Sequence, residues 1–355
     1  MKTVRLILIL ILSAAGARAQ ERGVVEGRLV NRTDPSILPS GAPLEILELE
    51  GGMRTIRSAV TDAAGGVRIE GLPRSERLML RASWRGVPYH APLAFDAAGV
   101  ARVELEVYET TSSDADIRVE KVQMAFQFSG DRIQALETWT LHNRSRPPRI
   151  YADPAGTFRI SKAPGILQPP RMRVTAPDST MPLVQPALES ADGESYYTLY
   201  PLRPGLTLIE AEQALPYADR AYTFVKKFHR DVEAFHIGVL PADMLLEGAG
   251  IERVESPGGM AVYSSPAAGA GTEAAWTFSG GTPVPAASAP GASAPGAEEA
   301  EEGDRVVARP SAVGRNALVI GPLLLLSFIL PLWYACNRPP GRGRTAKAYS
   351  EKVKP

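Results

Sequence analysis

Two histidines and a glutamate come nearest to a catalytic arrangement in this chain of 355 residues. His229 and His236 lie seven positions apart, with Glu233 between them. Imidazole and carboxylate groups can bind zinc and activate water, so these residues are candidate ligands of a metal-dependent hydrolase. Their spacing differs from H-E-x-x-H, and on one strand it places His229 and His236 on opposite faces. Only a hairpin could bring them together, so we expect surface or strand histidines and no metal site.

The rest of the sequence contains no catalytic motif. It has neither a G-x-S-x-G nucleophile elbow nor a G-x-x-x-x-G-K-[ST] phosphate loop. The only cysteine is Cys336, so the chain before it has no disulfide, thiol nucleophile, thiolate metal ligand or c-type haem attachment site. The 39 basic and 39 acidic residues cancel, which argues against nucleic acid as a partner. We expect no catalytic residues, no cofactor-binding residues and no cofactor.

Both ends of the chain carry membrane signals. A basic start, an apolar run at 6–15 and small residues up to Ala19 predict a cleaved signal peptide at 1–19. Residues 317–336 carry no charge, and a helix of that length crosses the ~30 Å hydrocarbon layer once. The tail at 337–355 is basic, which predicts a cytoplasmic tail by the positive-inside rule. The expected location is the inner membrane, with a single pass and the N-terminal body in the periplasm.

Residues 281–316 differ in kind from the rest of the chain. They are rich in Pro, Ala, Ser and Gly and then acidic, with almost no large apolar side chain before Val306. Such a segment cannot bury enough apolar surface to fold, so we expect a disordered linker between the outer domains and the membrane helix.

Residues 20–110 are predicted to form a small β-sandwich. Gly 32 and Pro 31 in the whole chain suit short strands joined by turns. Alternating apolar and polar residues predict strands at 24–30, 44–49, 54–60, 67–69, 78–84 and 103–108.

Four stretches of this part follow a recognisable order. They read VEGRLVN at 25–31, GAPLEILEL at 41–49, AVTDAAGGVRIEGLP at 59–73 and LMLRASWRGVPY at 78–89. In this order the chain resembles the carboxypeptidase regulatory-like (transthyretin-like) family, although Val67 stands where that family usually has an aromatic residue. The resemblance implies a seven-stranded sandwich that serves as a structural or binding accessory. It implies no peptidase activity.

Residues 111–280 are predicted to form a second β-rich domain, which we interpret as an Ig-like sandwich. Its expected strands lie at 117–122, 124–128, 133–141, 196–200, 206–209, 222–228, 235–239, 262–263 and 276–278. The strands at 222–228 and 235–239 suggest a hairpin around Arg230 and Asp231. The proline-rich stretch 163–186 suggests a long irregular connection or an edge.

Aromatic residues are concentrated in this second domain. We interpret them as core or strand-pairing residues rather than as a platform for sugars. They are Tyr196, Tyr197, Tyr200, Tyr217, Tyr222, Phe224 and Phe228. The neighbouring Lys226 and Lys227 are predicted to lie on a solvated face.

Three functions are compatible with these features. The leading hypothesis is a non-enzymatic, membrane-tethered protein that presents two β-sandwich domains to a protein or glycan partner outside the cytoplasm. The second is an accessory subunit of an inner-membrane complex, with the helix at 317–336 as a contact; Pro322, Ser327 and Pro331 within it favour this reading. The third is a metal-dependent hydrolase that uses His229, Glu233 and His236.

Overall fold

The computed structural model describes residues 22–177, 179–254 and 259–283, and in these ranges the protein is mainly β. The described residues form several sheets and contain no helix. Consequently, no helix in this part of the chain is long and apolar enough to cross a membrane. The signal peptide at 1–19, the linker from residue 284 onward, the membrane helix at 317–336 and the tail at 337–355 all lie outside the described residues.

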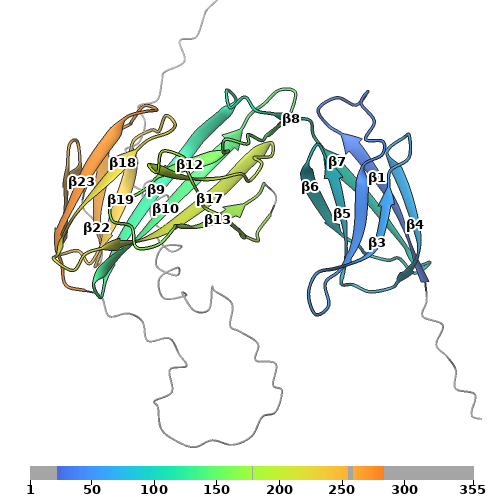
Figure 1. The fold of residues 1–355 in the computed structure, drawn as a ribbon, viewed down its shortest axis with the longest axis horizontal. Helices are drawn as coiled ribbons and strands as arrows, with labels where there is room; N and C mark the ends of the chain where they lie inside the picture. Colours follow the sequence, from blue (N-terminus) through green and yellow to red (C-terminus); the bar gives the residue numbers. More distant parts are fainter. Residues whose placement is uncertain (1–21, 178, 255–258, 284–355) are drawn as a thin grey trace, which may run out of the picture. The chain divides into compact units, whose positions relative to one another are not determined.

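The first seven strands form two sheets (Figure 1). The strands are β1 (Arg22–Asn31), β2 (Pro43–Glu48), β3 (Arg54–Val60), β4 (Gly66–Pro73), β5 (Leu78–Trp84), β6 (Val87–Pro92) and β7 (Val100–Val107). One sheet has the order β4-β1-β7 and the other has the order β3-β2-β5-β6. The strand β1 pairs antiparallel with β4 and parallel with β7.

The alternation in these strands has the expected physical basis. In β1 the side chains of Val25 and Leu29 are buried, whereas Arg28 is exposed. The buried members pack with those of the second sheet, including Leu44 and Leu80, in one apolar cluster. All six strands predicted for residues 20–110 are present, whereas β6 was not predicted. This strand is short and contains Pro88 and Pro92, and prolines at such positions are more typical of a loop.

Sixteen further strands follow in the residues that the structure describes. The first eight are β8 (Thr110–Thr111), β9 (Ile117–Ser129), β10 (Arg132–Asn143), β11 (Ile150–Tyr151), β12 (Phe158–Ser161), β13 (Arg171–Thr175), β14 (Leu183–Gln185) and β15 (Leu188–Glu189). The others are β16 (Ser195–Thr198), β17 (Gly205–Pro216), β18 (Ala221–Lys227), β19 (Phe235–Leu240), β20 (Met244–Gly248), β21 (Glu252–Val254), β22 (Ala261–Ser265) and β23 (Glu273–Gly280).

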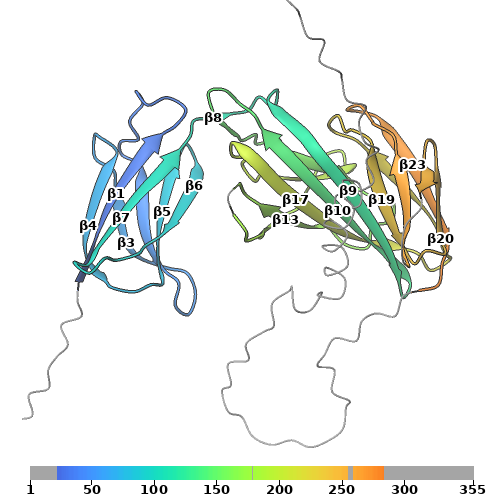
Figure 2. The same cartoon turned by 180° about the vertical axis from the view of Figure 1, so that it is seen from behind.

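An eight-stranded sheet is the frame of this second region. Its order is β14-β13-β17-β10-β9-β19-β22-β21, and Figure 2 shows its long strands β9, β10 and β17 side by side. Two three-stranded sheets, β12-β16-β15 and β18-β23-β20, complete the region. The arrangement is consistent with a β-sandwich. The proline-rich stretch 163–186 contributes β13 and the edge strand β14, in line with the expected edge.

Aromatic side chains join the large sheet to one of the small ones. The ring of Phe126 on β9 lies 5.4 Å from that of Phe224 on β18 and 4.6 Å from that of Phe278 on β23. The rings of Phe224 and Trp276 are stacked at 5.9 Å. All four side chains are buried in one core. Because such rings remove large apolar areas from water, they supply much of the attraction between the two sheets.

One predicted pairing is wrong. The strands β18 and β19 do not form a hairpin, because β18 pairs with β23 whereas β19 pairs with β9 and β22. The chain between them passes from a small sheet to the large one. Both strands contain alternating apolar residues, and periodicity alone cannot show which partner each strand chooses.

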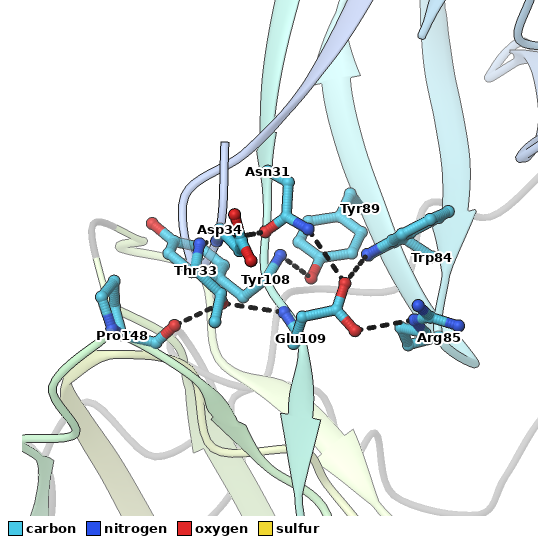
Figure 3. Close-up of polar contacts among 9 residues, drawn as sticks. All are labelled: Asn31, Thr33, Asp34, Trp84, Arg85, Tyr89, Tyr108, Glu109 and Pro148. Atoms are coloured by element: carbon cyan, nitrogen blue, oxygen red, sulfur yellow. Dashed lines mark hydrogen bonds and ion pairs between the residues drawn. The ribbon is translucent and has the colours of Figure 1, made fainter. Parts of the chain in front are cut away.

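Glu109, which follows β7, gathers three side chains of the first region (Figure 3). Its carboxylate accepts hydrogen bonds from Asn31 Nδ2 at 2.9 Å and from Trp84 Nε1 at 3.1 Å. The guanidinium of Arg85 lies 2.8 Å away and adds an ion pair. The network fixes the course of the chain as it leaves β7.

The next residues connect the two regions. The hydroxyl of Thr33 accepts a hydrogen bond from the amide of Glu109 and donates one to the carbonyl of Pro148 (Figure 3). The short strand β8 pairs with β11, and Ile150 of β11 is buried in the apolar cluster of the first seven strands. Contacts therefore cross position 110, where the sequence reading placed a domain boundary.

Candidate functional site

A cavity of about 210 Å³ lies in the second region where β12 and β18 approach each other. We call the boundary between these two strands the seam. Ser161 joins the two strands of the seam. Its hydroxyl accepts a hydrogen bond from the amide of Lys227 at 2.7 Å and donates one to the carbonyl of Lys227 at 3.0 Å. Residues 156–159 on one side and residues 226, 227, 229 and 230 on the other line the cavity. We refer to it below as the seam cavity.

Aromatic and cationic side chains line the seam cavity. The aromatic residues are Trp139, Tyr151 and Phe158. The cationic residues are Arg159, Lys226, Lys227 and Arg230, and Asp114 is the one carboxylate among the described lining residues. Because cations outnumber carboxylates here, the cavity favours an anion, and its aromatic side chains favour an apolar or planar group.

A buried ion pair supports the wall of the seam cavity. The Nζ atom of Lys226 lies 2.6 Å from Oε2 of Glu137, and the two side chains are 1% and 0% exposed. The indole Nε1 of Trp139 donates to the same oxygen at 3.0 Å, and Gln213 Nε2 donates to Oε1 at 3.4 Å. The ammonium also lies 5.2 Å from the centre of the Trp139 ring. These contacts offset the large cost of removing two charges from water.

His229 lies in the loop after β18 and lines the seam cavity. Its Nε2 atom is buried and has no hydrogen-bond partner among the described residues. Burial lowers the pKa of this imidazole to about 4, and the positive charges of Lys226, Arg159 and Lys227 contribute to the shift. His229 is therefore neutral at neutral pH and carries an unused polar atom.

The cations of the cavity differ in how far they are neutralised. Arg230 forms an ion pair with Asp114 at 3.1 Å. Lys227 lies 3.7 Å from Glu194, with both side chains largely exposed. Arg159 donates to Ser195 Oγ and to the carbonyl of Ala155, which are neutral groups. Within the described residues, Arg159 forms no ion pair with a carboxylate, although its positive charge helps to lower the pKa of the nearby Asp192.

The three metal-ligand candidates do not come together. His229 lines the seam cavity, Glu233 is exposed in the following segment, and His236 is exposed on β19, where it pairs with Gln123 and Ser264. The hairpin that could have joined the histidines is absent for the reason given above. In the part of the chain that the structure describes, no group of three His, Cys, Asp or Glu side chains could hold a metal ion.

The tyrosine and phenylalanine residues behave as the sequence suggested. Tyr196, Tyr217, Phe224 and Phe228 are buried in the core. Tyr200 and Tyr222 are partly buried and pack against it. Tyr197 is half-buried, and the guanidinium of Arg159 lies 5.3 Å from the centre of its ring. These residues do not form an exposed aromatic platform.

The prediction that Lys226 lies on a solvated face is wrong. Because of it, the buried pair of Lys226 and Glu137 was not predicted. Lys226 is buried, whereas only Lys227 is partly solvated. The alternation of the strand contains the missed signal, because Phe224, Lys226 and Phe228 share one face. In the same way, Glu137 lies on the face of β10 that carries only buried residues. A lysine and a glutamate, each on an apolar face, indicate a buried pair.

Comparison with known proteins gives no further assignment. No family model matches the sequence, and no curated protein matches it significantly. The interpretation of the site therefore rests on its geometry and charge.

Proposed function

We propose that this chain is a non-enzymatic binding protein, tethered to the inner membrane by residues 317–336 with its β domains outside the cytoplasm. The observation that carries the proposal is the seam cavity, which combines aromatic side chains with Arg159, a cation whose hydrogen bonds go to neutral acceptors. Such a surface binds an anionic group and positions an apolar one beside it. The resemblance of residues 20–110 to carboxypeptidase regulatory-like domains supports an accessory role for that part.

The architecture suits binding more than chemistry. The buried Lys226–Glu137 pair and its hydrogen-bond partners Trp139 and Gln213 lie inside the sandwich, where they stiffen the wall of the cavity. Cations at its mouth attract an anionic partner over distances of up to about 8 Å at physiological salt. A rigid wall lowers the entropic cost of binding.

Crosslinking in intact cells tests this proposal. Cells that produce the full chain are crosslinked, and proteins captured by wild type and by Arg159→Gln are compared. We expect at least one envelope protein to be captured by the wild type and lost in Arg159→Gln. The matched control is Arg28→Gln, an exposed arginine on β1, which should capture the same protein as the wild type.

A second variant separates this proposal from the accessory-subunit hypothesis. Residues 317–336 are replaced by an unrelated apolar helix, which preserves the tether and removes specific helix contacts. Capture should persist if the seam cavity binds the partner. Capture that is lost with the new helix and retained in Arg159→Gln would contradict the proposal and favour the accessory subunit.

A further inference from the structure

We infer that the seam cavity binds the C-terminal carboxylate of a polypeptide, between His229 and Arg159, with the last side chain against Trp139 and Phe158. The inference rests on the proposed binding function and names the ligand class of the same site.

Two groups provide the donors for the carboxylate. A tautomer of His229 with its proton on Nε2 can donate to one oxygen, and this buried nitrogen has no other partner among the described residues. Arg159 offers several N–H groups and already uses two of its nitrogens on neutral acceptors. Lys227 adds a second positive charge at the mouth, where its own ion pair is long and solvated.

The size of the cavity limits what can enter it. Its volume of about 210 Å³ is below the roughly 300–1,000 Å³ of sites that enclose a whole small molecule. It can enclose one terminal group with its side chain, while the rest of the ligand stays outside. The chemical end of a larger molecule therefore fits better than a free metabolite.

The backbone at the seam favours a polypeptide over another acidic polymer. The amide of Lys162 donates to the carbonyl of Glu194 at 2.8 Å, and in an antiparallel pair of strands every second residue is hydrogen-bonded to the residue opposite it. Ile160 and Tyr196 are therefore the next hydrogen-bonded pair between β12 and β16. Arg159, which lies between Ile160 and the preceding bonded position, directs its backbone amide and carbonyl away from β16, toward the seam. An extended peptide that enters beside the cavity meets these groups and can add hydrogen bonds to β12.

Binding of a carboxylate should also be linked to a proton. His229 faces Lys226 and Lys227 from β18, Arg159 from β12, and Asp192 from the turn before β16. Arg230 and Asp114 line the same cavity. The bound carboxylate favours the imidazolium and raises the pKa of His229 above its value of about 4 in the free protein. Affinity should therefore rise as pH falls through the pKa of the complex.

The test uses the full-length protein in detergent and a pool of N-acetylated hexapeptides with random residues at the last three positions. Free acids and isotopically labelled C-terminal amides are mixed in equal amounts, and retained peptides are counted by mass spectrometry. We expect free acids to be enriched at least tenfold over amides at pH 6. Arg159→Gln should abolish this enrichment, and Arg28→Gln should preserve it.

His229→Gln tests the contribution of the histidine. This variant should retain part of the enrichment of free acids over amides. In the wild type the enrichment should increase between pH 7 and pH 5, and the variant should lose this increase. Equal retention of acids and amides by the wild type would overturn the inference, as would enrichment that survives Arg159→Gln. Amides that end in Glu and are retained as well as free acids would show a general anion site and would also overturn it. In these cases, capture in cells that still depends on Arg159 would leave the proposed function standing.

Discussion

On the outer face of the β4-β1-β7 sheet, Glu26 lies directly opposite Arg68 on one side and Arg102 on the other. Both arginines form ion pairs with it, and all three side chains are at least 40% exposed. In the second region, Glu137 also faces a cation, Lys226, but neither side chain is exposed by more than 1%. Each region therefore pairs a glutamate with a cation, at the surface in the first region and in the core in the second.

The difference shows what each pair can contribute. Glu26, Arg68 and Arg102 form what we call the surface ladder. Water solvates these side chains whether or not they contact one another, so each contact adds little to the free energy of folding and keeps the sheet face soluble. The buried pair has lost that water, so each charge depends on the other and on the Trp139 and Gln213 hydrogen bonds. Breaking the buried pair should be costly, and breaking the ladder should not.

The single substitution Lys226→Met tests the buried half of this comparison. It keeps a side chain of similar length and leaves the Glu137 carboxylate buried without its ammonium. We expect the free energy of unfolding to fall by about 3–5 kcal/mol. Urea denaturation followed by tryptophan fluorescence measures it, with the exposed Lys121→Met as the control. A loss no larger than that of the control would show that the pair contributes nothing.

The double substitution Lys226→Met/Glu137→Gln identifies the cause of that loss. An uncharged amide at position 137 removes the stranded charge and still accepts the hydrogen bond from Trp139. We expect the double variant to recover about 2–3 kcal/mol relative to Lys226→Met alone. If it is as unstable as the single variant, lost packing rather than the unpaired charge explains the damage.

His229 gives a pH-dependent version of the same contrast. Its pKa is lowered from 6.5 to about 4, so the unfolded chain binds the proton more readily than the folded chain. The stabilising effect of the neutral imidazole is therefore complete above about pH 6.5 and declines as pH falls towards 4. Denaturation at a series of pH values should show a steeper decline for the wild type than for His229→Gln. Parallel curves would mean that the ring is solvated.

Period-two patterns account for what the sequence could predict. They located the longer strands, whose buried and exposed residues alternate as in β5, but they missed β6, β12 and β20, which are short. They could not pair the strands, because β18 and β19 carry similar apolar faces and join different sheets. Which faces meet is decided by contacts between distant segments, such as Phe126 with Phe224 and Phe278.

The site was harder to predict than the fold for a related reason. Lys226 was interpreted by residue type, as a solvated charge, although its neighbours Phe224 and Phe228 place it on the core face. The seam cavity depends on the approach of β12 and β18, which are separated by about sixty residues and joined through Ser161. No local pattern encodes such an approach, whereas the buried charges on β10 and β18 could have been recognised as a pair.

The smallest effect is expected for Arg68→Gln, which breaks the surface ladder. Arg68 forms ion pairs with Glu26 and Glu70. Both contacts raise the pKa of Arg68, and the hydrogen bond to Glu70 has the largest effect. The side chain is 57% exposed, so water and salt replace the lost contacts, and Arg102 still neutralises Glu26. The unfolding midpoint of the first region should stay within experimental error of the wild type at 0.15 M salt, and any loss should shrink further at 1 M. A loss comparable to that of Lys226→Met would mean that the ladder acts as a cooperative network, and solvent exposure would then not be the property that separates the two regions.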